Sequence, residues 1–174
     1  MSALFLVVGS SASGKDTAID YAISKISNLK KAKRHITREA SKTEDFVSIK
    51  KEDFKKEDYE IWWELYGKFY GVKKEDVIFQ LMNGLSIILN ISRDALLQAK
   101  KLWKETYVVE FKVPVEIIKK RLIERKREKQ KEIDERIKRA MQEIDSNPDI
   151  IIDSSHPDAS IAGKKLTGFI KKRI

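Results

Sequence analysis

The residues with the clearest chemical potential lie near the amino terminus, where two glycines bracket a run of small polar residues. Gly9 and the pair Gly14-Lys15 have the G-x-x-x-x-G-K spacing of a phosphate-binding loop. Backbone N–H groups in such a loop curl around a phosphate, the next helix adds its positive dipole, and Lys15 can reach β- and γ-phosphates. The predicted nucleotide-binding residues are Gly9, Ser10, Ser11, Ala12, Ser13, Gly14, Lys15, Asp16 and Thr17.

The candidate metal ligands come directly after Lys15. A Ser or Thr hydroxyl usually contacts Mg²⁺ at this position, but here it is Asp16, and Thr17 follows one place later. A carboxylate is a good oxygen ligand, so we expect Asp16 or Thr17 to hold the ion, directly or through water. The alternative role for Asp16 is that of an acid in the first helical turn, where the helix dipole favours it.

A second group of candidate residues lies between Lys119 and Gln142, where basic side chains outnumber acidic ones. Its arginines are Arg121, Arg125, Arg136 and Arg139. Spacings of four and three residues place each pair on one helix face. Two helices meeting near Lys129 to Lys131 would bring both pairs over the phosphate loop, where guanidinium groups neutralise a transferring phosphoryl group after closure. A solvated charged hairpin and a nucleic-acid patch are the alternatives, although this stretch has no aromatic residue for base stacking.

Composition limits the classes of function. The chain has 174 residues, no Cys, two His and a formal net charge of +9, so disulfides, zinc-thiolate sites and thiol catalysis are excluded and an anionic partner is expected. No apolar run approaches the ~20 residues that a membrane span needs. The N-terminus has neither the basic region nor the cleavage site of a signal peptide, so we expect a cytoplasmic protein. The oligomeric state stays open.

The hydrophobic pattern predicts strands that alternate with helices. Strands are expected at 3–8, 33–37, 86–90, 107–113 and 149–153, and helices at 15–27, 76–83, 95–104, 115–129, 132–144 and 158–172. Short strands at 46–49, 59–63 and 69–72 indicate a small mixed insertion. This order predicts one α/β domain with a parallel sheet flanked by helices, of the P-loop NTPase type. The core is expected at 1–33, 84–118 and 145–174, an acceptor-binding insertion at 34–83 and a helical lid at 119–144.

These motifs resemble the guanylate-kinase-like branch of P-loop kinases over nearly the whole chain. The residues Arg121-Leu122, Arg125, Ile133, Arg136 and Arg139-Ala140 match the lid pattern of that group. In it the lid arginines contact ATP phosphates and the first stacks near adenine. Arg38 falls where the group places an acceptor-phosphate arginine, and Tyr70-Gly71 matches its tyrosine-glycine pair.

Several features fit one sub-branch, the ribose 1,5-bisphosphate phosphokinases. They are Gly14-Lys15-Asp16, Trp63 to Gly67 before Phe69-Tyr70-Gly71-Val72, and Asn90-Ile-Ser92-Arg93. Ile61 takes the place of the carboxylate with which guanylate kinases read guanine, and Ser41 that of a second phosphate arginine. Lys42-Thr-Glu44-Asp45 replaces the glycine-glutamate-asparagine-histidine run of the ribose enzymes.

The resemblance implies transfer of the ATP γ-phosphoryl group, with Mg²⁺, to the 1-phosphate of ribose 1,5-bisphosphate, giving phosphoribosyl pyrophosphate. It implies that Lys15, Arg121, Arg125 and Arg136 act on the transferring group and that Arg139 binds nucleotide. The implied acceptor ligands are Arg34, Arg38, Tyr70, Asn90, Ser92 and Arg93, whereas Trp62, Trp63, Tyr66 and Phe69 are expected to pack in the core. The alternatives are a guanylate kinase or related nucleoside-monophosphate kinase, and a non-enzymatic basic nucleotide- or nucleic-acid-binding module.

Overall fold

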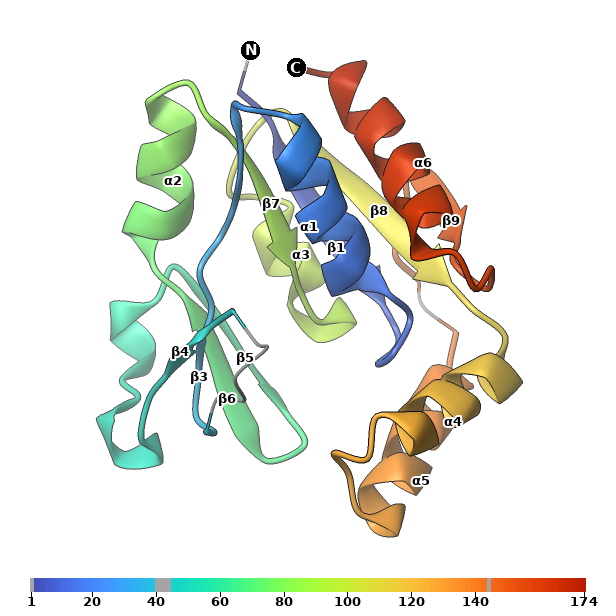
Figure 1. The fold of residues 1–174 in the computed structure, drawn as a ribbon. Helices are drawn as coiled ribbons and strands as arrows, with labels where there is room; N and C mark the ends of the chain where they lie inside the picture. Colours follow the sequence, from blue (N-terminus) through green and yellow to red (C-terminus); the bar gives the residue numbers. More distant parts are fainter. Residues whose placement is uncertain (1, 40–44, 144) are drawn as a thin grey trace.

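A parallel sheet forms the centre of the protein (Figure 1). The structure is a computed structural model that describes residues 2–39, 45–143 and 145–174. Five strands lie in the order β2-β7-β1-β8-β9, and every neighbouring pair is parallel. They are β1 (Leu4–Gly9), β2 (Leu29–Lys31), β7 (Ser86–Asn90), β8 (Thr106–Lys112) and β9 (Ile150–Asp153). The predicted α/β fold is thereby confirmed.

Strand β1 lies at the middle of the sheet because its unbroken apolar run supplies two hydrophobic cores. Phe5 and Val7 face one core, which helices α1 (Lys15–Lys25) and α6 (Ala159–Lys171) cover. Leu4 and Leu6 face the other, against α2 (Lys74–Met82) and α3 (Leu96–Ala99). All four side chains are fully buried, as expected for a strand covered by helices on both faces. Within the described ranges, no helix is both long and apolar enough to cross a membrane.

A second, smaller sheet packs beside the carboxyl ends of the parallel strands (Figure 1). Its order is β4-β3-β6-β5, with β3 (His35–Ile36), β4 (Val47–Ser48), β5 (Ile61–Leu65) and β6 (Lys68–Val72). Strands β5 and β6 form an antiparallel hairpin in which Leu65 pairs with Lys68. Two short 3-10 helices, η1 (Lys51–Asp53) and η2 (Lys56–Asp58), connect β4 to β5. The predicted mixed insertion is therefore a four-stranded sheet.

The predicted lid consists of two helices that lie at the opposite side of the molecule from the second sheet (Figure 1). Helix α4 (Val115–Glu124) begins after Pro114, and α5 (Gln130–Ala140) begins after Lys129, whose backbone N–H donates to the Glu132 carboxylate at 2.8 Å. Both helices end earlier than the predicted 129 and 144. Ile144 itself lies outside the described residues.

Two other sequence predictions need correction. The predicted strand at 33–37 is only the two-residue β3, which belongs to the second sheet, whereas the edge strand of the parallel sheet is β2, which ends before the predicted range. The predicted helix at 95–104 is a short 3-10 turn, η3 (Arg93–Ala95), followed by α3, which ends at Ala99. Ser41 and the run from Lys42 to Glu44, which bear on the acceptor, lie outside the described residues.

Candidate active site

The phosphate loop follows β1 and ends at the first residue of α1. Gly9 and Gly14 have φ angles of +147° and +82°, and Gly14 is the N-cap of α1. A Cβ at Gly9 would approach the Phe111 carbonyl oxygen to 2.7 Å, so only glycine fits where β1 passes β8. The Ser154 hydroxyl donates to the Ser13 carbonyl and holds the loop against β9. The sequence pattern and the backbone agree on an anion cradle at this point.

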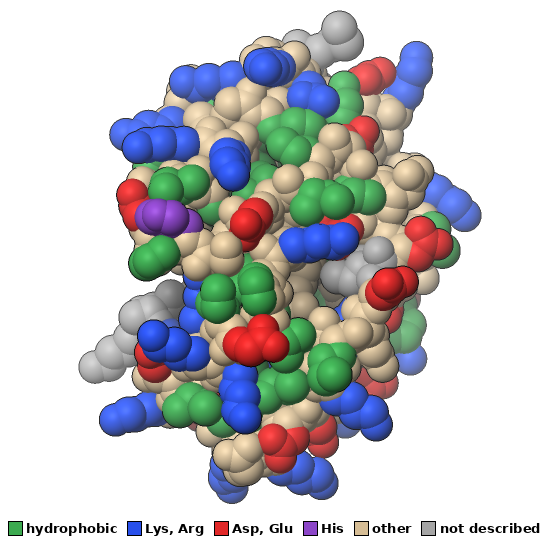
Figure 2. Space-filling view, turned by 90° about the vertical axis from the view of Figure 1, so that its right-hand side faces the viewer, with side chains coloured by type: hydrophobic (Ala, Val, Ile, Leu, Met, Phe, Trp, Pro, Cys, Tyr) green, Lys and Arg blue, Asp and Glu red, His purple; other side chains and the backbone are tan. Residues whose placement is uncertain are grey.

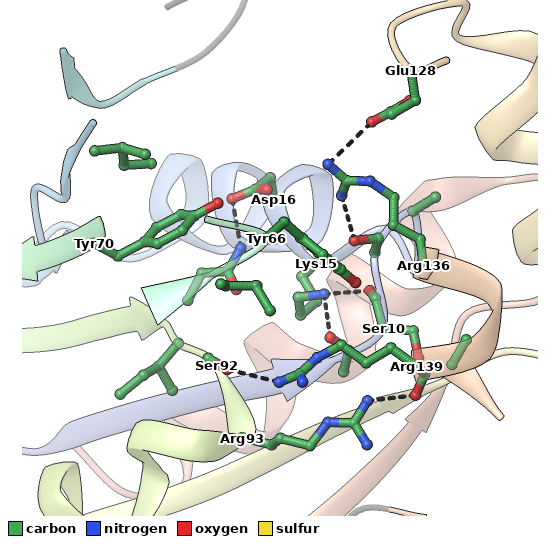
Figure 3. A pocket seen from close by; sticks show the side chains of 18 of the residues that line it. Ser10, Lys15, Asp16, Tyr66, Tyr70, Ser92, Arg93, Glu128, Arg136 and Arg139 are labelled. Carbon is green, nitrogen blue, oxygen red and sulfur yellow. Dashed lines mark hydrogen bonds and ion pairs between the residues drawn. The ribbon is translucent and has the colours of Figure 1, made fainter. Parts of the chain in front are cut away.

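Lys15 lies inside this loop and is almost fully buried. Its ammonium group donates to the carbonyl oxygens of Gly9 at 2.8 Å and Ser10 at 2.6 Å, and to the Ser13 hydroxyl at 3.1 Å (Figure 3). Burial is the main reason that its pKa falls from 10.5 to about 8, and Arg34 and Arg125 lower it further, although Asp16 opposes them. The cation is thus held at the centre of the cradle by backbone carbonyls and a hydroxyl group.

Asp16 lies at the edge where β1 and β7 end. Val7 pairs with Asn90, so the Asn90 amide reaches the Asp16 carboxylate and donates to it at 3.0 Å. Arg34 at 3.6 Å and Lys31 at 3.7 Å also face this carboxylate. Burial alone would raise the pKa of Asp16, but Arg34, the Asn90 hydrogen bond and Lys31 outweigh it and lower the pKa. Asp16 is therefore ionised at neutral pH and faces the pocket.

Among the lid arginines that line the pocket, Arg125 and Arg136 meet above the loop. Arg136 donates to the Ser11 hydroxyl at 2.7 Å, so α5 contacts the phosphate loop directly. Arg125 pairs with Glu128 in a bidentate contact, and Glu128 also lies 3.5 Å from Arg136. Only 7% of the Glu128 side chain is exposed. One buried carboxylate thus fixes both guanidinium groups at the mouth of the loop.

Arg121 lies on the other side of the loop. It donates to the carbonyl oxygens of Ala12 at 3.3 Å and Ser154 at 2.7 Å. It lines a second cavity of about 230 Å³, together with Thr17 and the turn that precedes α6. Asp16 lines the main pocket and Thr17 the second cavity, so the two candidate metal ligands lie on different sides.

The remaining lid arginine and the loop after β7 form a clasp, which we define as Ser92, Arg93, Asp94 and Arg139. Arg139 donates to the Ser92 hydroxyl at 3.1 Å and pairs with Asp94. Arg93 donates to the carbonyl oxygens of Arg139 at 2.6 Å and Gln142 at 3.1 Å (Figure 3). Arg93 lines the pocket as the sequence predicts, but it also caps the end of α5. The clasp joins the lid to the parallel sheet.

The main pocket brings most of the predicted residues together. Its volume is about 330 Å³. Arg34, Arg38 and Tyr70 line it on the side of the second sheet, opposite the loop and lid. Tyr70 stacks on Trp63 with ring centroids 5.3 Å apart, and the Arg38 guanidinium lies 4.5 Å from the Phe46 ring centroid. Among the described lining residues, the carboxylates are Asp16 on α1 and Glu128 and Glu132 in the lid.

Relatives of known activity share the length of this chain. A ribose 1,5-bisphosphate phosphokinase from Desulfomicrobium baculatum is 33% identical over 98% of this chain and 95% of its own length. One from Psychromonas ingrahamii is 31% identical over 98% and 90%. The chain belongs to the ribose 1,5-bisphosphate phosphokinase family. No protein-family model matches the chain.

A solved structure supports the fold of this family member. A guanylate kinase from Anaplasma phagocytophilum superposes with a TM-score of 0.70, covering 99% of this chain and 86% of its own, at 17% identity. This similarity shows the fold. That the chain is an ATP-dependent kinase follows from its membership of the phosphokinase family. The relatives are phosphotransferases that act on a small phosphorylated compound.

Sequence reasoning missed several residues in or beside the pocket of this phosphokinase, among them Tyr66, Glu128 and Lys31. Tyr66, which we expected in the core, lines the pocket at the tip of the β5–β6 hairpin. Glu128 was not singled out, because an acid among lid arginines looks like an ordinary surface charge. Lys31 faces Asp16 from the edge strand β2. The arginine spacing that predicted the lid residues does not indicate Tyr66, Glu128 or Lys31.

Proposed function

We propose that this protein transfers the γ-phosphoryl group of ATP to the 1-phosphate of ribose 1,5-bisphosphate, giving phosphoribosyl pyrophosphate and ADP. The observation that carries the proposal is the pocket between the phosphate loop and Arg34, Arg38 and Tyr70. A donor phosphate in the loop and an acceptor phosphate beside these arginines would face each other across it. The names of the relatives supply the identity of the acceptor.

The reaction needs alignment and charge neutralisation more than proton transfer. The second pKa of a phosphate monoester is near 6, so the 1-phosphate is largely dianionic at neutral pH and one of its oxygens is the nucleophile. That oxygen bonds to the γ-phosphorus as the bond to the β-bridging oxygen breaks, and ADP leaves. In this proposal Lys15, Arg125 and Arg136 neutralise the charge that develops on the transferring group.

The second cavity supports a place for the adenosine part of ATP. It adjoins the loop at Ala12 and Gly14 and is lined by Arg121 and Thr17. A guanidinium group that is fixed by two backbone carbonyls presents a flat face on which a purine can stack. We therefore assign the base to this cavity and the phosphates to the main pocket.

Asp16 fits a role in binding Mg²⁺. Among the residues that the structure describes, no three His, Asp or Glu side chains gather into a metal site. Mg²⁺ bound to a nucleotide needs only one or two carboxylates, since phosphates and waters complete its shell. Asp16 is ionised, hydrogen-bonded by Asn90 and on the pocket side of Lys15. The ion supplies charge neutralisation on the β- and γ-phosphates when it is bound.

The pocket disfavours guanine as the acceptor. Ile61 is 1% exposed and packs in the core between β5 and α2, so this position offers no group to a base. The described residues of the second sheet place no carboxylate in the pocket. Besides the aliphatic Ile36 and Leu65, the lining of that side is cationic and aromatic, which suits a phosphorylated sugar better than a purine edge.

A product analysis tests the proposal. The protein is incubated with Mg²⁺, ATP and ribose 1,5-bisphosphate, and the products are identified by mass spectrometry, with GMP as the parallel acceptor and Lys15→Ala as the matched inactive control. We expect ADP and phosphoribosyl pyrophosphate only with the unmodified protein and the ribose compound. Conversion of GMP to GDP at a comparable or higher kcat/KM would reject this acceptor assignment.

A further inference from the structure

Tyr66 occupies a backbone position that an aromatic residue does not favour. The β5–β6 hairpin closes through the two residues Tyr66 and Gly67, whose φ angles are +52° and +69°. Such a turn is usually Asn-Gly, because a side chain with a Cβ is strained at positive φ and asparagine tolerates it best. A strained residue that persists at a pocket indicates a functional constraint.

The contacts of Tyr66 point away from its own sheet. The Arg136 guanidinium lies 4.8 Å from its ring centroid, and this same guanidinium donates to the Ser11 hydroxyl at 2.7 Å. Burial raises the pKa of Tyr66, while Arg136, Arg139 and the Ser11 hydroxyl as a hydrogen-bonding partner lower it. The ring thus meets the phosphate loop and α5 at one point of the main pocket (Figure 3).

Core packing does not account for this arrangement. Tyr66 belongs to none of the hydrophobic clusters, whereas its neighbours Trp63 and Tyr70 pack against the core that covers β1. A Cβ added to the adjacent Gly67 would meet no atom within 4 Å, so the hairpin tip itself is loosely surrounded. The side chain instead contacts Arg136 of the lid and Ser11 of the phosphate loop.

We infer that Tyr66 is a positioning residue through which the acceptor-side hairpin, Arg136 and the phosphate loop move as one unit. A phosphate in the loop would draw Arg136 toward it, and the ring that lies over this guanidinium would carry the hairpin along. Acceptor binding would in turn favour the arginine position that ATP needs. Coupling of this kind is reciprocal, so each substrate should tighten the binding of the other.

The inference rests on the proposed function only for the identity of the acceptor. Tyr66→Asn removes the ring but restores the residue that the turn prefers, so the variant should melt at or above the temperature of the unmodified protein. Tyr66→Phe keeps the ring over Arg136 and removes only the hydroxyl. Tyr107→Phe is the matched control, since Tyr107 stacks on Phe5 with centroids 5.5 Å apart, away from the pocket.

The first measurement needs no acceptor. Adenylyl imidodiphosphate with Mg²⁺ is titrated while tryptophan emission is recorded. The emission comes from Trp62 and Trp63 on β5 of this hairpin and from Trp103, whose indole donates to the Ser2 carbonyl and which does not line the pocket. We expect an emission change in the unmodified protein and in Tyr107→Phe, a smaller one in Tyr66→Phe and none in Tyr66→Asn, although calorimetry still detects nucleotide binding. The same change in Tyr66→Asn, or none in the unmodified protein, would overturn the inference.

The second measurement determines how much ribose 1,5-bisphosphate tightens the binding of this analogue. By calorimetry we expect the Kd to fall at least about fivefold in the unmodified protein, the lower end of ordinary coupling, and to stay unchanged in Tyr66→Asn. Equal tightening in both proteins would also overturn the inference. If the ribose compound does not bind the unmodified protein, the proposed acceptor is wrong, and the emission measurement alone decides on Tyr66.

Discussion

The surroundings of Lys15 strongly lower its pKa. Loss of its positive charge at high pH should therefore lower the rate of reaction with ATP. Burial lowers the pKa of Lys15 to about 8, so the free protein loses this positive charge as the pH rises above that value. We expect kcat/KM for ATP, which reports on the free enzyme, to fall about tenfold per pH unit above this pKa. Bound phosphates raise the pKa again, so kcat should decline only at higher pH. A kcat/KM that stays level well above pH 8 would contradict the assignment.

Two substitutions can distinguish a Mg²⁺ ligand at Asp16 from an acid that only stabilises the first turn of α1. Asp16→Asn removes the charge next to Arg34 and Lys31, and we expect the Mg²⁺ concentration for half-maximal activity to rise about tenfold or more. Asp16→Ser introduces the hydroxyl that most phosphate loops have and should restore much of the Mg²⁺ affinity. If Asp16 only interacts favourably with the helix dipole, both variants lose about 0.3–1 kcal/mol of stability and keep the Mg²⁺ dependence of the unmodified protein.

Residues held by local backbone geometry could be predicted, whereas residues placed by tertiary contacts could not. Gly9, Gly14 and Lys15 are defined by spacing, because the loop needs a positive φ and a lysine at fixed positions. Tyr66 and Glu128 reach the pocket only because a hairpin and a lid from distant parts of the chain meet there. A single sequence carries no signal for that meeting.

At the scale of elements, the lid is attached to the sheet through the clasp, and Arg93→Ala should loosen it. Removing this guanidinium leaves the carbonyls of Arg139 and Gln142 at the end of α5 without their donor. We expect faster hydrogen exchange in α5, faster tryptic cleavage in the lid and a lower kcat, with little change in the melting temperature.

Arg173→Ala is the matched control for the clasp, because Arg173 likewise donates to a helix carbonyl, that of Phe169 at 3.0 Å, but at the end of α6. It should leave exchange in α5 unchanged. If Arg93 served only as an acceptor ligand, Arg93→Ala would raise the KM for the acceptor and leave lid exchange as it was.

Elements with a strong hydrophobic pattern were predicted well, and the short edge elements were not. Strands β1 and β7 are buried along their length and show as apolar runs. Strand β2 has a single buried residue, Leu29, followed by two lysines, so its pattern is that of a loop. Helix α4 ends early because Arg125 and Lys126 turn the chain, with a φ of +50° at Lys126.

At the scale of the whole molecule, folding brings arginines from distant parts of the chain together in the main pocket. Arg34, Arg38, Arg125, Arg136 and Arg139 all line the main pocket. On the face shown in Figure 2, Lys and Arg side chains are interspersed with acidic and hydrophobic ones. This grouping of guanidinium groups suits a small phosphorylated ligand bound in a pocket.

Because loop, lid and second sheet all contribute to the pocket, ligand binding should stabilise the entire fold. A ligand at one hundred times its Kd adds about 2.7 kcal/mol, which for a chain of this size corresponds to a rise in Tm of roughly 5–10 °C. We expect Mg²⁺ with ATP to produce such a shift in the unmodified protein and in Lys171→Ala, whose exposed lysine lies at the end of α6. Lys15→Ala should stay folded, since burial disfavours the charged ammonium and lowers its pKa to about 8, and should lose most of the shift. An equal shift in Lys15→Ala would place the nucleotide elsewhere, because the Lys15 ammonium lies among the carbonyls of Gly9 and Ser10 inside the loop.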